Sequence, residues 1–351
     1  MKVKELFPEL SAEDNGVVFI DALHCPVFRL TGLPFLETNG NYHRLDDRLS
    51  DKLSEGLTIR SNNTSGVQLA VRTDSRLVGL RVKLDSPEFM EHMPDDATSS
   101  FDIYKGSGMN KKFWHVIYNG RPRSEYTEIF GTDGSIEDYT FYFPLYSGIE
   151  KLEIALCADA DIEAPTPFRI DRPVLVYGSS ITQGGCVSRP GNLYTSMIGR
   201  MLDVPTICMG FSSNARGEEY IAESFSTLDL AAFVMDYDHN APNAECLEQT
   251  HKKFFNILRA ARPDMPIVLV SKPDFDDDPV SGAQRRSVIL KTYTDALAAG
   301  DRNVWFVDGE RIFDGPFRDS CTVDRNHPSD IGHMRIALTV GHVLGRALGL
   351  E

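Results

Sequence analysis

The fold of this chain is indicated most clearly by the stretch Val174-Leu-Val-Tyr-Gly-Ser-Ser-Ile-Thr-Gln-Gly184. Its apolar and β-branched run stops at Gly178, and two serines and a polar turn follow. Such a run is typical of a buried parallel strand, and the serines then lie in the turn that leaves its carboxyl end. In open α/β sheets ligands bind at that edge. Ser180 is therefore a candidate nucleophile, although the same turn taken alone is equally compatible with a helix start that carries no chemistry.

The second half of the chain repeats this alternation of apolar strand and helix. Strands are expected at 173–178, 204–210, 229–236, 266–271 and 303–308, and helices near 191–202, 217–227, 243–261, 281–299 and 329–348. Strands that alternate with helices form parallel sheets with right-handed crossovers. We therefore predict a flavodoxin-like, doubly wound five-stranded parallel sheet over residues 171–351, with ligands at its carboxyl edge.

The first half has a different pattern. Short alternating or aromatic-rich segments recur between turn residues at 66–72, 77–84, 101–104, 113–118, 139–145 and 151–156. Period-two alternation at this spacing is typical of an antiparallel sandwich. We predict an all-β sandwich or jelly-roll domain over residues 1–170, joined to the α/β domain by the proline-containing stretch 159–173.

Composition excludes several classes of partner. The 351 residues suffice for two domains, and 42% hydrophobic and 25% charged residues are ordinary for a globular protein. A formal net charge of −15 argues against nucleic acid and against anionic membranes, since both require a basic surface. The sequence has no run of 18 apolar residues, so we predict no transmembrane helix. We expect no nucleic-acid or membrane partner; self-association into a homo-oligomer is left open.

The amino terminus and the cysteines bear on the compartment. Met1-Lys-Val-Lys-Glu-Leu lacks the apolar segment of a secretory signal, although a chain trimmed of its signal would look the same. Six scattered cysteines without a Cys-x-x-Cys pair favour buried, reduced thiols over disulfides or zinc. We expect a cytoplasmic protein without a metal or cofactor. The acidic run 274–278 lacks the glycine and distal glutamate of a calcium loop, so a solvated turn is the preferred interpretation.

A candidate base lies near the far end, in Asp324-Arg-Asn-His-Pro-Ser-Asp330. Pro328 interrupts any helix there, so His327 belongs to a loop, and Ser329 begins the last helix as its N-cap. A serine hydroxyl becomes a nucleophile when one histidine nitrogen accepts its proton and an acid holds the other nitrogen. Ser180, His327 and Asp324 could supply these parts, which predicts an acyl-transferring hydrolase; the alternative is a surface loop.

These residues resemble the SGNH hydrolase superfamily, also called the GDSL lipase or esterase family. Gly178-Ser-Ser180-Ile-Thr-Gln-Gly184 is similar to the family's nucleophile block, and Asp324-Arg-Asn-His327 is similar to its Asp-x-x-His block. The resemblance implies that Ser180, Asp324 and His327 are catalytic. Ser179 departs from the commonest motif, which has aspartate there.

The same resemblance implies an oxyanion hole. Met209-Gly210-Phe-Ser-Ser-Asn214 resembles the block whose glycine N–H lines that hole, and Asp236-Tyr-Asp-His-Asn240 loosely resembles the block that supplies an asparagine. The implied donors are the N–H groups of Ser180 and Gly210 and the side chain of Asn240, with Asn243 as a rival. Fixed donors of this kind are worth roughly 3–4 kcal/mol each in the transition state.

A subgroup of the family resembles the chain best. Its members have Gly-Ser-Ser or Gly-Thr-Ser at the nucleophile and an N-terminal β-rich domain with a Gly-x-Asp-Leu-Tyr motif, to which Ser100-Phe-Asp102-Ile-Tyr104 is similar. The resemblance implies a serine esterase that removes a small acyl group, with acetyl as the leading candidate, from a carbohydrate or small metabolite. Two alternatives stay open: an acyltransferase using the same residues, and a glycan-binding protein with a silent catalytic site. Dinucleotide binding is disfavoured because the first turn is not Gly-x-Gly-x-x-Gly.

Overall fold

A computed structural model of the chain describes residues 1–118, 123–273 and 276–351. The chain forms two compact units. Unit 1 comprises Met1–Asp47, Ser61–Phe168 and Arg189–Gly191, and unit 2 comprises Arg48–Arg60, Arg169–Ser188 and Asn192–Glu351. Each unit therefore contains a short segment from the other half of the sequence. The domain boundary expected near residue 170 stays a prediction.

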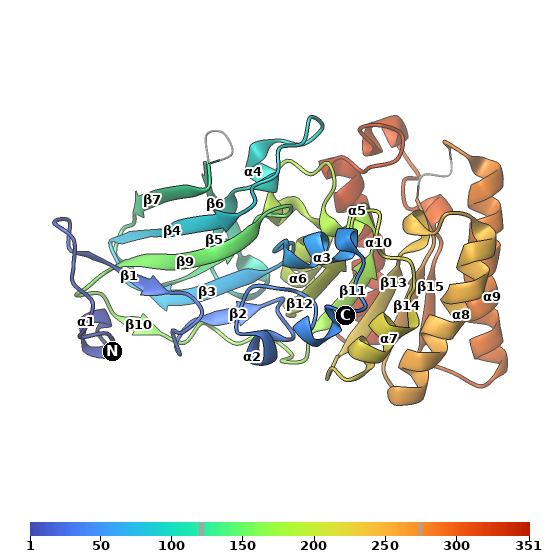
Figure 1. The fold of residues 1–351 in the computed structure, drawn as a ribbon, viewed down its shortest axis with the longest axis horizontal. Helices are drawn as coiled ribbons and strands as arrows, with labels where there is room; N and C mark the ends of the chain where they lie inside the picture. Colours follow the sequence, from blue (N-terminus) through green and yellow to red (C-terminus); the bar gives the residue numbers. More distant parts are fainter. Residues whose placement is uncertain (119–122, 274–275) are drawn as a thin grey trace. The chain divides into compact units, whose positions relative to one another are not determined.

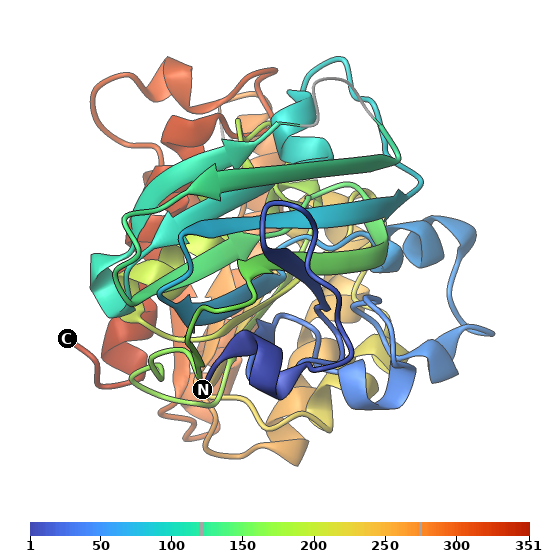
Figure 2. The same ribbon diagram turned by 90° about the vertical axis from the view of Figure 1, so that its left-hand side faces the viewer.

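Unit 1 contains two antiparallel sheets (Figure 2). The first has the strand order β1-β9-β4-β7, and the second has β10-β3-β8-β5-β6, with β2 paired to β3. Their bounds are β1 Val17–Asp21, β2 Arg29–Thr31, β3 Gln68–Thr73, β4 Leu77–Asp85, β5 Phe101–Lys105, β6 Lys112–Ile117, β7 Glu125–Gly131, β8 Glu137–Tyr142, β9 Gly148–Cys157 and β10 Ile162–Glu163. The short helices of unit 1 are α1 Val3–Leu6, which precedes β1, and α2 Leu36–Asn39 and α4 Asp95–Thr98, which lie between strands. Helix α3 Glu55–Asn62 lies mainly in unit 2.

One apolar core joins the two sheets of unit 1. Leu80 and Ile154 come from the first sheet, Val71 and Phe141 come from the second, and all four are fully buried in the same cluster. Alternating residues of facing sheets form such a core, so the prediction of a β-sandwich is confirmed. The six predicted segments all fall on strands of this sandwich.

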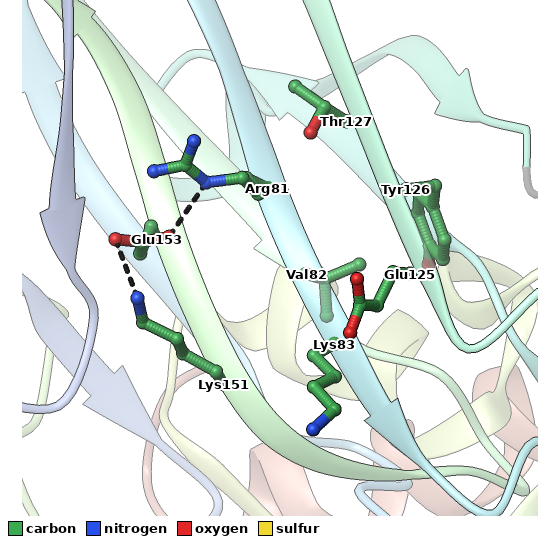
Figure 3. Close-up of a pocket in the computed structure, with 8 residues that line it drawn as sticks. All are labelled: Arg81, Val82, Lys83, Glu125, Tyr126, Thr127, Lys151 and Glu153. Carbon is green, nitrogen blue, oxygen red and sulfur yellow. Dashed lines mark hydrogen bonds and ion pairs between the residues drawn. The ribbon is translucent and has the colours of Figure 1, made fainter.

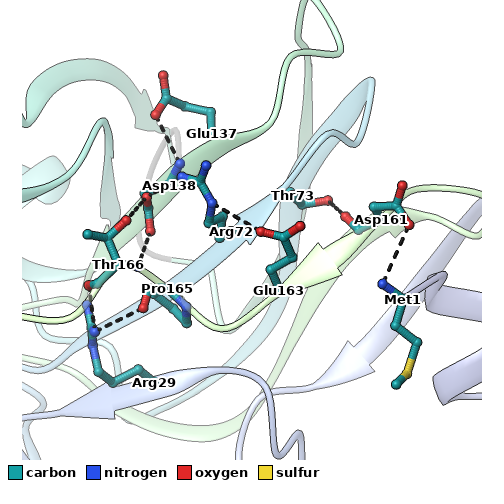
Figure 4. Close-up of polar contacts among 10 residues, drawn as sticks. All are labelled: Met1, Arg29, Arg72, Thr73, Glu137, Asp138, Asp161, Glu163, Pro165 and Thr166. Carbon is teal, nitrogen blue, oxygen red and sulfur yellow. Dashed lines mark hydrogen bonds and ion pairs between the residues drawn. The ribbon is translucent and has the colours of Figure 1, made fainter.

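A buried carboxylate holds the last segment of unit 1 against the second sheet (Figure 4). Asp138 on β8 accepts hydrogen bonds from Arg72 Nη1 at 2.8 Å and from the Thr166 N–H and hydroxyl at 2.8 and 2.7 Å. Arg29 Nη1 donates to the Thr166 carbonyl at 2.8 Å. Asp138 is only 3% exposed, and this set of donors satisfies its charge. The proline-containing stretch is thereby fixed in place.

Unit 2 contains the predicted parallel sheet, in the order β12-β11-β13-β14-β15 (Figure 1). The strands are β11 Val174–Gly178, β12 Thr206–Gly210, β13 Ala232–Asp236, β14 Ile267–Val270 and β15 Val304–Val307. Its helices are α5 Ser180–Gln183, α6 Tyr194–Leu202, α7 Glu219–Ser226, α8 Ala244–Ala261, α9 Pro279–Ala298 and α10 Asp330–Ala347. Helices α6 and α10 pack together, and α7, α8 and α9 form a second contiguous layer. The strand order reverses at β11, so right-handed crossovers place these layers on opposite faces.

Local signals set the starts of the long helices. Ser329 caps α10, and Asp278 caps α9 by accepting from the Ser281 N–H at 3.0 Å, with Pro279 at the first helical position. Of the predicted acidic turn, Asp274 and Phe275 lie outside the described residues. Within the described ranges, no helix is long and apolar enough to cross a membrane.

Candidate active site

Three strand ends meet at the carboxyl edge of the parallel sheet. Gly178 at the end of β11 is in register with Gly210 of β12 on one side and with Asp236 of β13 on the other. Helix α5 then begins at Ser180, and the Ser179 hydroxyl caps it by accepting from the Ile181 N–H at 3.1 Å. Ser180 thus lies where the strand order reverses, the position at which such sheets bind ligands.

Two glycines let α5 sit directly on these strand ends. A Cβ at Gly178 would lie 2.0 Å from Thr182 Oγ1, and a Cβ at Gly210 would lie 2.1 Å from the Gln183 nitrogen. Both distances are far below van der Waals contact, so any larger residue would displace the turn that carries Ser180.

The structure brings the three predicted side chains together. Ser180 Oγ lies 3.0 Å from His327 Nε2, and His327 Nδ1 lies 2.7 Å from Asp324 Oδ2. Ser180 as a whole is 9% exposed. This is the geometry in which a histidine accepts a serine proton while an acid orients the ring. The catalytic roles of the three residues stay predictions.

A tight turn positions His327. Asp324 Oδ1 accepts from the N–H groups of Asn326 at 3.0 Å and His327 at 2.7 Å, and the Val323 N–H donates to the His327 carbonyl at 2.9 Å. Partial burial raises the pKa of Asp324, but the hydrogen bonds from His327 and Asn326 outweigh it, so this pKa lies below its ordinary value. Asp324 is therefore ionised at neutral pH, and its carboxylate can accept a hydrogen bond from His327 Nδ1–H.

The two candidate asparagines have different surroundings. Asn240 Nδ2 donates to the Phe211 carbonyl at 2.8 Å, which places its amide beside the residue that follows Gly210. Asn243 is the N-cap of α8, and its side-chain oxygen accepts from the Cys246 N–H at 2.8 Å. Asn243 thus has a structural task of its own. The assignment of Asn240, like that of the Ser180 and Gly210 N–H groups, stays a prediction.

Sequence reasoning missed the ion pair that holds the Asn240 turn. Asp238 is 1% exposed, and Arg285 on α9 donates to its carbonyl at 2.7 Å and to its Oδ1 at 3.1 Å. The Lys272 N–H donates to Asp238 Oδ2 at 3.0 Å. Arg285 lies 47 residues from Asp238 in sequence and gave no local signal, because only folding places α9 beside this turn.

His333 also lies near the nucleophile turn. It is buried on α10, and its Nε2 lies 3.2 Å from the Gly185 carbonyl, which directly follows α5. Burial lowers the pKa of His333 to about 4, so the ring is neutral at pH 7 and Nε2–H is the donor. This contact packs α10 against the chain segment that follows α5.

In unit 1, side chains of the predicted Ser100–Tyr104 motif contact the short segment Arg189–Gly191. Asp102 is fully buried, and its Oδ2 accepts from Arg189 Nη1 and from the Gly191 N–H, both at 2.7 Å. Tyr104 OH accepts from Arg189 Nη1 at 2.8 Å, and the guanidinium carbon lies 4.1 Å from the centroid of the Phe113 ring. A Cβ at Gly191 would lie 2.6 Å from the Tyr104 ring, so glycine is required there.

A hollow in unit 1 lies away from these residues (Figure 3). It opens on the four-stranded sheet, where Arg81 pairs with Glu153 at 2.8 Å and Lys151 pairs with Glu153 at 3.1 Å. Arg81 on β4 and Lys151 on β9 thus share the Glu153 carboxylate, and surface ion pairs of this kind contribute little energy. Across the described parts of the chain, no cluster of three His, Cys, Asp or Glu residues is placed to hold a metal.

Comparisons with known proteins show the family and the fold. Residues 171–345 match the model of the GDSL-like lipase/acylhydrolase family, and residues 17–162 match the N-terminal GxDLY model of SGNH-hydrolase-type esterases. Among curated proteins, no relative matches the sequence.

Solved structures share the fold at low identity. A putative GDSL-like lipase from Bacteroides ovatus has a TM-score of 0.84 at 22% identity, covering 95% of this chain and 99% of its own. A salicylyl-acyltransferase from a tetracycline biosynthetic pathway has a TM-score of 0.79 at 20% identity, covering 96% and 99%. A family two carbohydrate esterase from Cellvibrio japonicus has a TM-score of 0.61 at 14% identity, covering 95% and 98%. The two family models together span most of the sequence, and the chain belongs to the GDSL-like lipase/acylhydrolase family of SGNH-hydrolase-type esterases.

Proposed function

We propose that the protein is a serine esterase that removes a small acyl group, acetyl in the first instance, from a carbohydrate or small metabolite through an acyl-enzyme. The observation that carries this proposal is the hydrogen-bonded series from Ser180 Oγ to His327 Nε2 and from His327 Nδ1 to Asp324 Oδ2. It lies at the ligand-binding edge of a doubly wound sheet. A merely structural serine would not need an imidazole oriented by an ionised carboxylate.

The geometry supports a two-step acyl transfer. His327 Nε2 accepts the proton of Ser180 as its oxygen forms a bond to the ester carbonyl carbon, and Asp324 stabilises the imidazolium. The N–H groups of Ser180 and Gly210 and the Asn240 amide would hold the developing oxyanion. Collapse breaks the ester bond, and His327 returns the proton to the leaving alcohol. Water, deprotonated by His327, then attacks the acyl-enzyme and releases the acid and free Ser180.

The proposed substrate class is supported by relatives. Several solved structures with this fold, including the one from Cellvibrio japonicus, are carbohydrate esterases.

Acyl transfer to another hydroxyl is the second candidate. The salicylyl-acyltransferase with the same fold favours it, and the same Ser180 acyl-enzyme would serve with an alcohol in place of water. Product analysis in the presence of competing alcohols separates the two: free acid as the main product supports hydrolysis, and a new ester as the main product supports transfer.

Substitution of the nucleophile tests the enzymatic proposal. We expect Ser180→Ala to abolish turnover of p-nitrophenyl acetate, because no other group in the series can form the acyl-enzyme, while the melting temperature stays near that of the parent. His327→Ala should lose activity similarly, whereas His342→Ala, which alters an exposed histidine of α10, should not. Parental turnover by Ser180→Ala would refute the assignment.

A further inference from the structure

A buried triangle of polar groups lies under the nucleophile turn in unit 2. Tyr194 OH donates to Asp236 Oδ2 at 2.6 Å, and Thr182 Oγ1 donates to the same oxygen at 3.1 Å. The two hydroxyl oxygens lie 3.0 Å apart. Thr182 and Tyr194 are fully buried and Asp236 is 5% exposed. Three polar side chains from a helical turn, a helix and a strand therefore share one site away from water.

Thr182 connects this triangle to the nucleophile. It follows Ser180 by two residues within the single turn of α5. Its hydroxyl is held by the triangle, its carbonyl accepts from Cys208 Sγ at 3.0 Å, and its backbone rests against Gly210. Because both ends of Thr182 are fixed, the orientation of the whole short turn is fixed as well, although a four-residue helix has little stability of its own.

Asp236 is the acceptor on which the triangle depends. Burial raises its pKa to about 6, and the hydrogen bonds from Tyr194 and Thr182 oppose that rise. At neutral pH the carboxylate is therefore ionised and accepts both hydroxyls as charge-assisted hydrogen bonds. Loss of the Tyr194 or Thr182 hydroxyl leaves the buried Asp236 carboxylate with too few hydrogen bonds, and the α5 turn is then held less firmly. Asp236 is also in register with Gly178, so it lies at the base of the turn.

We propose that Asp236, acting through Thr182 and Tyr194, is a positioning residue that sets the alignment of Ser180 Oγ with His327 Nε2. Its side chain accepts hydrogen bonds from Thr182 and Tyr194 and would act on Ser180 through them. The inference rests on the proposed function, because alignment matters only if Ser180 is the nucleophile. Small misplacements of a nucleophile cost about 10²-fold in rate for 1 Å, so the anchor should influence the rate of attack rather than substrate affinity.

The test compares Thr182→Val, which removes the hydroxyl at nearly constant shape, with Thr182→Ser, which retains it. The readouts are the rate of Ser180 phosphonylation by a small fluorophosphonate, followed by intact mass, and kcat and KM for p-nitrophenyl acetate. We expect Thr182→Val to lower the phosphonylation rate and kcat by about 10- to 100-fold with KM little changed. Thr182→Ser should restore most of the rate.

A matched control separates positioning from stability. Thr250→Val removes another Thr–Tyr hydrogen bond of unit 2, the 2.9 Å contact with Tyr237 OH, which does not involve α5. It should lower the melting temperature by a similar amount while Ser180 reacts at the parental rate. If Thr182→Val unfolds, Tyr194→Phe, which retains the ring and removes one donor to Asp236, replaces it in the comparison.

The outcomes are distinguishable. Equal phosphonylation rates for Thr182→Val and Thr182→Ser, or an equal loss in Thr250→Val, would overturn the positioning role and leave the esterase proposal intact. A parent protein whose Ser180 is not phosphonylated would instead overturn the proposed function itself, and the positioning role with it.

Discussion

At the residue scale, two asparagines three positions apart perform different tasks. Asn240 directs its amide toward the Phe211 carbonyl beside Gly210, whereas Asn243 caps α8 through the Cys246 N–H. An amide carries two donor hydrogens, so Asn240 retains one besides the bond to Phe211. A capping side chain is already committed to the helix it begins. The cap leaves Asn243 committed to α8, and the assignment of Asn240 as the third oxyanion donor stays a prediction.

Paired substitutions distinguish the two asparagines. We expect Asn240→Ala to lower kcat by about 10²- to 10³-fold, since an oxyanion donor is lost, with little change in unfolding. Asn243→Ala should leave kcat unchanged and lower the free energy of unfolding by about 1 kcal/mol through loss of the cap. Ester turnover and urea denaturation measure both. The reverse pattern would transfer the donor role to Asn243.

At the element scale, α5 contacts the ends of β11 and β12 closely because the residues at those ends are glycines, which have no side chain. Gly178 and Gly210 are adjacent in register, and each accommodates atoms of the turn where a Cβ would lie. This close contact brings Ser180, the first residue of α5, to the edge of the sheet. Ser180 is therefore positioned by strand–turn packing as much as by its own loop.

An added methyl group tests this packing. Gly210→Ala should destabilise the protein by about 1–3 kcal/mol, because the new Cβ meets backbone atoms that cannot move independently. Gly131→Ala is the matched control, since no heavy atom lies within 4 Å of a Cβ there and its φ is ordinary. Urea denaturation compares the two. Equal unfolding midpoints would show that the turn does not rest on β12 as described.

At the scale of the whole molecule, buried titratable groups couple folding to pH. Burial lowers the pKa of His251 to about 3 and that of His333 to about 4, from 6.5. Below pH 6.5 the unfolded chain binds protons at these rings and the folded one does not, so each contributes a loss of stability as pH falls. Asp236 acts in the opposite sense between about pH 6 and 4, because its raised pKa lets the folded state bind the proton first.

The two histidines should dominate this balance. We expect the free energy of unfolding to fall between pH 6.5 and 4, with each neutral histidine contributing up to about 1.4 kcal/mol per pH unit. His251→Gln can still bond Thr292, which lies 2.9 Å from His251 Nδ1, but it does not titrate. It should therefore flatten the slope. Urea denaturation at pH 7 and pH 5 measures the difference, and an unchanged slope would contradict the expectation.

The sequence by itself determined the features that depend on nearby residues. Period-two alternation predicted the β-sandwich, and the alternation of strands with helices predicted the parallel sheet. The Asp324–His327 turn and the Ser329 cap depend on hydrogen bonds between residues three positions apart. The glycine after the β11 run predicted where Ser180 would lie. Resemblance to a family supplied the role of Gly210, which no local pattern would have indicated.

Only the tertiary structure decided which distant groups meet. The Ser180–His327 contact joins residues 147 positions apart, and its distance depends on strand order and register rather than on either local sequence. The same holds for Asp236 with Tyr194, and for the placement of Arg189–Gly191 in unit 1. Hydrophobic periodicity determines which face of a helix or strand is buried, but not which distant polar side chains become hydrogen-bond partners there. Those partners are set by three-dimensional packing, because a buried charge is stable only when it accepts or donates hydrogen bonds.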